Sequence, residues 1–461
     1  MCIRDRAMWI KYEYPDITFE DMCKVFGIPK LRKKAHFCAI PSTSCLLYTS
    51  IGSATIELLV GEIMNSNLHV LFSKKVPSHG VKKGIIEDEH LLVNDIKAVV
   101  QEANEFLDGE IKAIGLTIPT IRSKLYQSNS TVSLNHEAKI TKDDIVRGLK
   151  LSTKFKRSSE EEVVCVIPVK FNGDFGISNQ PPIGESSRNL IVDTLVITSQ
   201  KCILYPYIMA VEKAGLEVMD ICINAFACAK EAFDAVYLQE GAVLIDMGYK
   251  TSTISFYKDG YLKYLTVCSV GGYNLTRAIA QNLQISMNQA EAYKIKYGSL
   301  DYTIGQEDII HSTELPDGRK DYTQKDFAHI LEEATVDALN VIKEKLQIID
   351  DGSHYETLIV GGGGELEMLD KVAGNVLEGP VRVYRPDIIG IRDMAFVSAV
   401  GMIFYMSDRA KYLGAYETSV ILPDISNTMA VKFKGLTKTK DTKEKTGRFS
   451  RLLDTFFGEE E

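Results

Sequence analysis

The sequence predicts an α/β fold made of two similar lobes, and three observations lead to this prediction. Residues 51–60 and 244–256 share one motif, in which a turn of glycine and hydroxyl residues adjoins β-prone apolar runs. Strand-like and helix-like segments alternate along most of the chain, which is typical of α/β proteins. A third apolar run, residues 358–360, leads directly into four glycines.

Length and composition are those of a soluble globular protein with several subdomains. The chain has 461 residues, of which 45% are hydrophobic and 25% are charged, and these proportions are ordinary. The net charge of −9 argues against general nucleic-acid binding, because such binding needs a basic face. Nine cysteines without a CxxC pair and eight histidines without ligand spacing predict a reducing compartment and no metal centre of their own. No apolar run reaches the roughly 18 residues of a membrane span, so we expect a cytosolic protein or one attached to a membrane from the cytosolic side.

We expect the first lobe in residues 51–125. Its three opening strands are followed by a helix near residues 93–106 and an apolar strand at 111–118. A compact α+β insert then occupies residues 126–218. Its expected elements are strands at 163–168 and 190–197, helices near 142–154 and 207–214, and a Gly/Pro/Asn loop at 171–187.

The chain passes from the first lobe to the core of the second within residues 219–275, and the second lobe continues in 351–432. Between these parts lies a more helical insert, residues 276–350, with a long amphipathic helix expected at 326–348. Residues 394–405 are expected to form a helix that crosses the hinge and returns to the first lobe.

The two glycine and hydroxyl turns predict a phosphate site. A strand-turn-strand unit of this kind presents backbone N–H groups and hydroxyls to a phosphate. Gly52 and Ser53 occupy this place in the first turn, and Gly248 and Thr251 occupy it in the second. We therefore expect two half-domains that close on one nucleotide, with the later glycine run lying under the base and ribose.

Several segments of the chain resemble one protein family. The order of two phosphate turns and a Gly-rich loop is similar to that of the actin, heat-shock chaperone and sugar kinase superfamily. Within it, the chain resembles the FtsA family of bacterial cell-division proteins over about residues 51–457, and its insert at 126–218 lies where that family carries its own α+β subdomain. The segments that carry the resemblance are 211–218, 270–276, 290–298 and 396–401.

This resemblance implies an actin-like ATPase fold and a scaffold that uses ATP and Mg²⁺ as a conformational ligand, with at most slow ATPase activity. It also implies a protein that polymerises at the cytoplasmic face of the bacterial membrane, at the division site. There it would tether the ring of the tubulin-like protein FtsZ and meet other division proteins. The helical insert at 276–350 is the expected FtsZ-binding region.

The second turn departs from the family pattern. Relatives usually read Asp-x-Gly-Gly-Gly there, whereas this chain has Tyr249 and Lys250 in place of the last two glycines. A side chain at positive φ would cost on the order of 1–2 kcal/mol and would limit how near the backbone comes to a phosphate, so we expect binding without fast hydrolysis. Lys250 either places a charge on the phosphate or is only solvated. Asp246 is the expected catalytic and metal-site residue, which would hold a magnesium-bound water; alternatively, it caps a turn.

The resemblance also implies contacts to the rest of the nucleotide. Glu291 and Lys294 lie three apart on one helical face, where they would grip the ribose; the alternative is an ordinary surface ion pair. The remaining expected contacts are glycines that let the backbone approach the ligand. They are Gly271 and Gly272 near the phosphates and, unless the run is only a flexible loop, Gly361, Gly362 and Gly363 under the adenosine.

Residues 1–50 lie outside the resemblance. Segments 1–6 and 44–50 resemble translated sequencing-adaptor DNA, so we expect an artefactual head; a genuine N-terminal extension is the alternative. Relatives carry an aspartate at the position of Ser50, where it helps to hold magnesium and its waters. Residues 45–49 are apolar and β-prone enough to replace the missing first strand.

The C-terminal tail predicts a membrane contact. Residues 433–447 are expected to be a disordered linker, because they lack apolar periodicity, and 448–461 an amphipathic helix that fits a membrane interface. The alternative is a helix that docks on a protein groove, and the three closing glutamates argue mildly against anionic lipid. One helical face carries the apolar residues Phe449, Leu452, Leu453, Phe456 and Phe457.

Two rival functions stay open. One is a pilus-assembly adaptor resembling PilM, which shares the insert subdomain; the terminal amphipathic helix favours FtsA over it. The other is a small-molecule kinase of the same superfamily, for which the chain shows no clear catalytic Asp or substrate-pocket motif.

Overall fold

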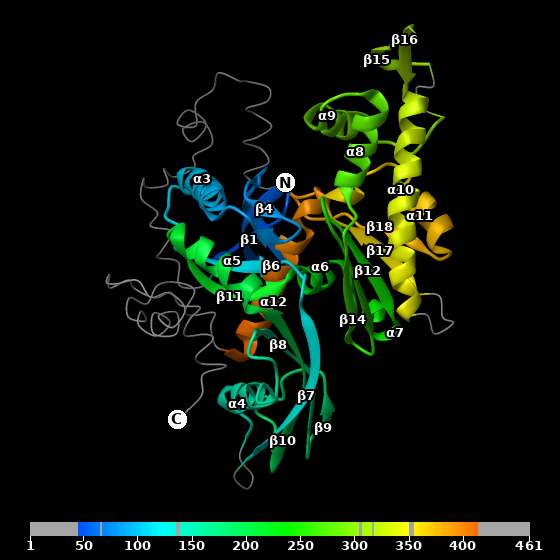
Figure 1. Ribbon diagram of the computed structural model, residues 1–461. Helices are drawn as coiled ribbons and strands as arrows, with labels where there is room; N and C mark the ends of the chain where they lie inside the picture. The colour runs from blue at the N-terminus through cyan, green and yellow to red at the C-terminus, as the bar shows by residue number, and fades with distance from the viewer. Residues whose placement is uncertain are drawn as a thin grey trace, which may run out of the picture. The chain divides into compact units, whose positions relative to one another are not determined.

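The computed structural model describes residues 45–64, 67–134, 139–303, 307–315, 318–349 and 355–413 (Figure 1). All of the described residues belong to one compact unit, Thr43–Glu461. Among the described helices, none is both long enough and apolar enough to cross a bilayer.

Lobe 1 is built on a five-stranded mixed sheet. The inner strand β1 pairs antiparallel with β2 on one side and parallel with β6 on the other. Both faces of the sheet are covered, since consecutive residues such as Leu58, Leu59 and Val60 are all fully buried. In spatial order the strands are β3 (Asn67–Pro77), β2 (Thr55–Met64), β1 (Cys45–Ile51), β6 (Ala113–Ile118) and β11 (Glu217–Ile223).

The sheet takes in residues 45–50, which the sequence analysis leaves outside the first lobe. The expectation that residues 45–49 form the first strand is confirmed, because β1 spans Cys45–Ile51. A small hairpin, β4 (Val81–Lys82) and β5 (Ile85–Ile86), follows β3.

Lobe 2 repeats the topology of lobe 1. Its inner strand β12 pairs antiparallel with β13 and parallel with β17, and the outer strands continue the same pattern. The predicted duplication, and with it the actin-like fold class, is therefore confirmed. In spatial order the strands are β14 (Tyr261–Cys268), β13 (Ser252–Lys258), β12 (Ala242–Met247), β17 (Glu356–Val360) and β18 (Val381–Val383).

Helices of lobe 1 pack on its sheet and against lobe 2. The expected returning helix is confirmed: a short turn, η3 (Met394–Phe396), leads into α12, which contacts α6, β1 and β6. Gly401 permits this close approach, because a Cβ there would collide with the carbonyl oxygen of Ala227 in α6. The helices of lobe 1 are α3 (Glu89–Leu107), α5 (Lys201–Lys213), α6 (Asn224–Ala232) and α12 (Val397–Leu413). The short helix α7 (Ala235–Glu240) contacts β13 of lobe 2.

The insert of lobe 2 is helical, with one added hairpin that the sequence analysis does not predict. The long helix expected at 326–348 is α10 (Gln324–Leu346), which begins at a capping box between Thr323 and Asp326 and ends in the turn η1 (Gln347–Ile349). The other elements of this lobe are α8 (Gly272–Leu283), α9 (Met287–Tyr297), the hairpin β15 (Ile309–Leu315) and β16 (Gly318–Thr323), η2 (Gly362–Gly364) and α11 (Leu369–Leu377).

The α+β insert of lobe 1 is a four-stranded antiparallel sheet with one helix on it. Phe171, Val192 and Leu149 lie in its own buried core. In spatial order the strands are β7 (Lys124–Ser133), β10 (Asn189–Gln200), β8 (Glu161–Gly173) and β9 (Gly176–Ser178), and the helix is α4 (Lys142–Ser152).

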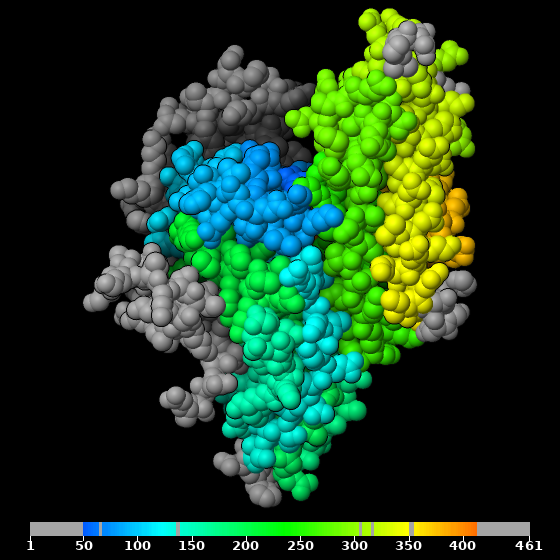
Figure 2. Space-filling view, viewed as in Figure 1, coloured from blue at the N-terminus to red at the C-terminus, as the bar shows by residue number. Residues whose placement is uncertain are grey.

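Two details of the insert differ from the sequence analysis. Strands β8 and β9 pair within the expected loop at 171–187. The insert also ends at Gln200 rather than 218, because α5 and β11 pack in lobe 1. Helix α5 begins at Lys201, so Pro206 lies inside the helix, whereas proline is usually found in the first turn of a helix. Figure 2 shows the surface of the early part of lobe 1, in blue, beside that of lobe 2, in green and yellow.

Candidate functional site

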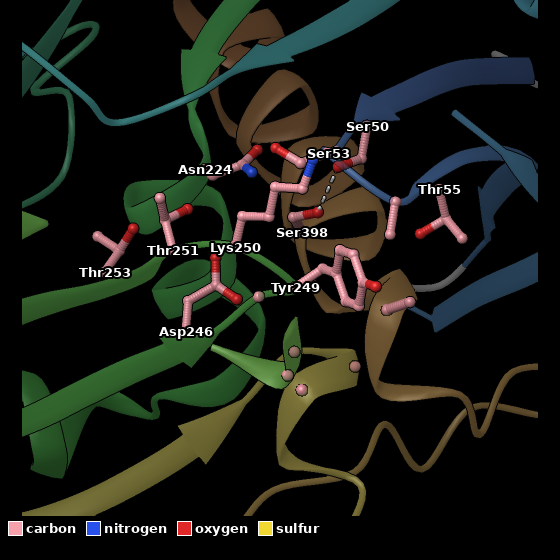
Figure 3. Close-up of a pocket in the computed structure, with 18 of the residues that line it drawn as sticks. Ser50, Ser53, Thr55, Asn224, Asp246, Tyr249, Lys250, Thr251, Thr253 and Ser398 are labelled. Atoms are coloured by element: carbon pink, nitrogen blue, oxygen red, sulfur yellow. Dashed lines mark hydrogen bonds between the residues drawn. The ribbon is translucent and has the colours of Figure 1, made fainter. Parts of the chain in front are cut away.

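The two hairpins, the glycine loop and the start of α12 enclose one cleft of about 390 Å³ (Figure 3). This volume is within the range of ligand pockets. With the exception of Gly271, every nucleotide-site residue that the sequence analysis names lines this cleft. These residues are Gly52, Ser53, Asp246, Gly248, Lys250, Thr251, Gly272, Glu291, Lys294, Gly361, Gly362 and Gly363.

The two turns are closed by the same backbone hydrogen bond. In the first, the amide of Gly52 donates to the carbonyl of Thr55 at 2.8 Å, and in the second the amide of Gly248 donates to the carbonyl of Thr251 at 3.0 Å. The repeated motif is therefore a repeated local structure, and both copies open into the cleft.

Asp246 lies at the end of β12 with its carboxylate directed into the cleft (Figure 3). Burial raises the pKa of Asp246 to about 6. The glycine loop passes directly over this strand end: a Cβ on Gly361 would meet Asp246 Oδ1 and, at 2.8 Å, the carbonyl of Met247. Gly361 also has φ of +87°, a conformation that favours glycine, so both the close packing and the backbone conformation favour glycine at this position.

Gly271 supports the second hairpin instead of facing the ligand site. A Cβ on Gly271 would lie 2.7 Å from the carbonyl oxygen of Tyr249. The amides of Gly272 and Tyr273, at the start of α8, donate to the carbonyls of Gly248 and Tyr249 at 3.0 and 2.7 Å. The expectation that Gly271 clears space for phosphates is therefore corrected: the clearance is for the hairpin backbone.

Tyr249 and Lys250 are accommodated without the expected backbone strain, since neither has positive φ. The Tyr249 ring packs edge-on against Tyr273 with centroids 5.7 Å apart, and Lys294 Nζ lies 5.4 Å from its centroid. Tyr249 is thus a wall of the cleft. The side chain of Lys250 extends from its hairpin toward Ser53 of the other lobe in Figure 3.

Glu291 and Lys294 form a buried network rather than an exposed surface pair. Lys294 Nζ lies 2.8 Å from Glu291 Oε2, and the lysine side chain is only 11% exposed. The ammonium also donates to Thr276 Oγ1 at 2.9 Å and to the carbonyl of Gly272 at 3.2 Å. Burial lowers the pKa of Lys294, while Glu291 opposes this shift.

The cleft contains polar residues that the sequence analysis does not name. Asn224, at the start of α6, has a buried Oδ1 without a hydrogen-bond partner in the described part of the chain. Glu57 lines the cleft from β2 and is only 4% exposed. Burial raises its pKa to about 7, against hydrogen bonds from Thr55 and Ser50. Asn224 could have been noticed, because it directly follows a strand of the parallel part of the sheet; Glu57 lies within a strand and carries no such signal.

A polar ligand fits this arrangement. The unpartnered Asn224 Oδ1 offers an acceptor, and the glycine loop brings bare backbone to the cleft wall. Ser50 completes the lobe 1 side, where it accepts a hydrogen bond of 3.2 Å from Ser398 of α12. The expected membrane-contact residues Phe449, Leu452, Leu453, Phe456 and Phe457 lie outside the described residues.

Comparisons with known proteins agree with this geometry. The family model described as cell division protein FtsA matches residues 243–401, a stretch that includes the second hairpin, Glu291, Lys294 and the glycine loop. Cell division protein FtsA of Bacillus subtilis (strain 168) is 27% identical over 437 residues, which cover 89% of this chain and 99% of that protein. This chain is therefore similar to FtsA proteins over most of its length.

Other relatives are consistent with this similarity. Cell division protein FtsA of Enterococcus faecalis (strain ATCC 700802 / V583) is 24% identical over 367 residues, covering 77% of this chain and 82% of that protein. A solved structure titled PilM-PilN type IV pilus biogenesis complex aligns with a TM-score of 0.54 at 14% identity, covering 78% of this chain and 98% of that one. That likeness shows the shared actin-like fold alone, so the relation to FtsA proteins rests on the sequence matches.

Proposed function

We propose that this chain is a member of the FtsA family, that it binds ATP with Mg²⁺ in the cleft, and that it acts as an actin-like scaffold of bacterial cell division. The observation that carries the proposal is the convergence of two matching turns and a glycine loop on one cleft, in a chain related to division proteins over most of its length. The PilM-like adaptor and the small-molecule kinase remain less favoured alternatives.

Each part of the cleft has a role in this proposal. The turn residues Gly52, Ser53, Gly248 and Thr251 would receive the phosphates through amides and hydroxyls. Glu291 and Lys294 would hold the ribose, and Gly361, Gly362 and Gly363 would lie under the adenosine. Mg²⁺, when bound, would neutralise phosphate charge, and Asp246 would hold one of its waters.

Hydrolysis is expected to be slow at most. The side chains of Tyr249 and Lys250 occupy the second turn, and Tyr249 is fixed by Tyr273 and Lys294. Binding energy would thus serve mainly to favour one arrangement of the lobes, because a ligand shifts a conformational equilibrium only by its difference in affinity for the two states.

The partners of the scaffold follow from the family resemblance and from the tail sequence. Closed subunits would stack into a filament at the cytoplasmic face of the cell membrane, at the division site. The insert that contains α8, α9 and α10 would hold FtsZ, and the tail helix at 448–461 would contact lipid. No nucleic acid is involved in this proposal.

The nucleotide site is tested with two glycine variants that differ only in place. A Cβ at Gly362 or at Gly379 would meet no atom within 4 Å, so both Gly362→Phe and Gly379→Phe are expected to fold. Only Gly362 lines the cleft. In calorimetric titrations with ATP, Gly362→Phe should bind at least about tenfold more weakly than the parent, a loss of about 1.4 kcal/mol, while Gly379→Phe should match the parent. Equal ATP binding by all three proteins would show that ATP binds outside this cleft. Absence of ATP binding by the parent would contradict the proposal.

A further inference from the structure

The two hairpins carry the same pair of chemical groups on opposite strands. In lobe 2, Asp246 of β12 pairs across the hairpin with Thr253 of β13. In lobe 1, the same register places Ser50 of β1 opposite Glu57 of β2. The two pairs occupy equivalent positions, because in each hairpin one further pair separates them from the turn. That pair is Met247 with Ser252 in lobe 2 and Ile51 with Ile56 in lobe 1.

Each hairpin therefore has a carboxylate at nearly the same place, although it belongs to the first strand of the hairpin in lobe 2 and to the second strand in lobe 1. Directly opposed residues of an antiparallel pair project from the same face of the sheet, with Cβ atoms about 4.5–5.5 Å apart. All four residues of these two pairs line the cleft. Figure 3 shows Ser50 on the side of lobe 1, and Asp246 and Thr253 on the side of lobe 2.

The carboxylate of Glu57 lies at the cleft beside hydrogen-bond donors and one lysine, Lys75, which is shared with Asp393. Hydrogen bonds from Thr55 and Ser50 reach the carboxylate. Lys75 lies opposite Glu57 in β3 and also lines the cleft; its charge opposes the rise that burial causes in the pKa of Glu57, while its ammonium forms an ion pair with Asp393. A buried carboxylate is costly unless a cation or donors compensate it, and this one has donors and an open cleft beside it.

We propose that Glu57 is the lobe 1 carboxylate that holds, through water, the divalent cation of the bound nucleotide, as the strand-exchanged counterpart of Asp246. The inference rests on the proposed nucleotide site. Among the described residues no group of three or more His, Cys, Asp or Glu side chains is placed to hold a metal ion by itself. The cation would therefore arrive with the phosphates, which suits Mg²⁺, an ion that keeps several waters and uses one or two carboxylates.

The experiment measures how strongly ATP affinity depends on Mg²⁺. The full chain is titrated calorimetrically with ATP in millimolar Mg²⁺ and again in EDTA. The parent should bind more tightly with Mg²⁺. Glu57→Gln keeps the shape of the side chain and an acceptor oxygen. Its ATP affinity in Mg²⁺ should fall about tenfold, or by about 1.4 kcal/mol, and its ATP affinity in EDTA should stay unchanged.

Two further variants separate this role from a general effect. Ser50→Asp combined with Glu57→Gln returns the carboxylate to the other strand of the same pair and should restore the Mg²⁺ dependence. Glu62→Gln removes a carboxylate from the same strand outside the cleft and should leave the dependence unchanged. Should Glu57→Gln fail to fold, Glu57→Asp, which withdraws the carboxylate by one carbon, should show an intermediate loss.

Uptake of Mn²⁺ gives a readout independent of affinity. With ATP present, the parent should remove Mn²⁺ from solution, seen as loss of the free-ion electron paramagnetic resonance signal, and Glu57→Gln should remove less. Unchanged Mg²⁺ dependence and Mn²⁺ uptake in Glu57→Gln would overturn the inference while leaving the nucleotide site standing. An equal loss of ATP affinity with and without Mg²⁺ would also overturn it. Failure of the parent to bind ATP under both conditions would instead end the proposed function, and this inference with it.

Discussion

Single residues around the cleft act mainly through close packing and burial. Gly361 and Gly363 are required by the carbonyl oxygens of Met247 and Gly248, which a Cβ would approach within 2.8 Å or less. Gly362, between them, has open space. Within the run, two tightly packed positions thus flank one free position, a distinction that composition cannot make.

Glu231 of α6 provides a test of how burial sets charge. Burial raises the pKa of Glu231 to about 7, and its Oε1 accepts a hydrogen bond of 2.9 Å from Tyr384. The unfolded chain ionises near the ordinary value of 4.5, so folding binds a proton between these two values. The contribution of Glu231 to the free energy of unfolding is therefore lost as the pH rises toward 7, because burial in the folded protein disfavours the charged carboxylate.

We predict that Glu231→Gln removes this pH dependence. The amide keeps an acceptor for Tyr384 and carries no charge. Relative to the parent, the variant should gain about 2 kcal/mol of unfolding free energy between about pH 5 and about pH 8. Guanidinium unfolding at both pH values measures the difference. The exposed Glu240→Gln is the control, and a constant difference between Glu231→Gln and the parent would contradict the assigned cause.

At the scale of elements, α12 connects the cleft to β11, the edge strand of the lobe 1 sheet. Its first turn carries Ser398, which reaches Ser50, and its last turns carry Arg409, whose Nη1 lies 2.5 Å from Asp220 Oδ1 of β11. Both members of this ion pair are buried. Burial raises the pKa of Asp220, and the Arg409 charge opposes that shift.

We predict that the two charges are strongly coupled. Arg409→Met leaves a buried carboxylate without its cation and should cost about 3 kcal/mol of unfolding free energy. Asp220→Asn combined with Arg409→Met should cost less than the sum of the two single variants, because neither charge then stays buried alone. Denaturant unfolding of the four proteins gives the coupling energy. Additive losses would show that the pair does not act as a unit.

At the scale of the whole molecule, the lobes share a core. Ala242, Leu244 and Leu358 of the lobe 2 sheet belong to the same buried cluster as the residues of α6 and α12. The opposite face of the lobe 2 sheet has its own core with α8, α10 and α11. Movement of one lobe against the other would therefore involve the face covered by α6 and α12.

The proposed membrane contact belongs to this scale, because it depends on many copies acting together. A short amphipathic helix binds a bilayer weakly alone, and a row of linked copies binds by avidity. We predict that Phe456→Asp reduces flotation of the full chain with phosphatidylcholine–phosphatidylglycerol liposomes at least about tenfold, since a charge replaces a buried aromatic.

Thr455→Asp is the matched control for this prediction. It adds the same charge away from the apolar helical face, so flotation should change little. ATP affinity should stay at the parent value in both variants. Flotation that survives Phe456→Asp would contradict the anchor, and equal loss in both variants would point to net charge instead.

The sequence by itself determined the features that depend on local pattern. The repeated turns, the long helix α10 with its capping box, and the glycine run after β17 follow from neighbouring residues, because turn chemistry and helical periodicity act over a few positions. These features were sufficient to predict the duplicated fold and the turn and loop residues that line the cleft.

Only the tertiary structure decided the features that depend on residues far apart in the chain. The place of Glu57 opposite Ser50 comes from strand register, and a shift by one residue would turn its side chain to the other face. The support that Gly271 gives to the second hairpin, the burial of Lys294 beside Thr276, and the assignment of α5 and β11 to lobe 1 come from packing between distant segments. Such contacts are set by the assembled core, so no short stretch of sequence contains them.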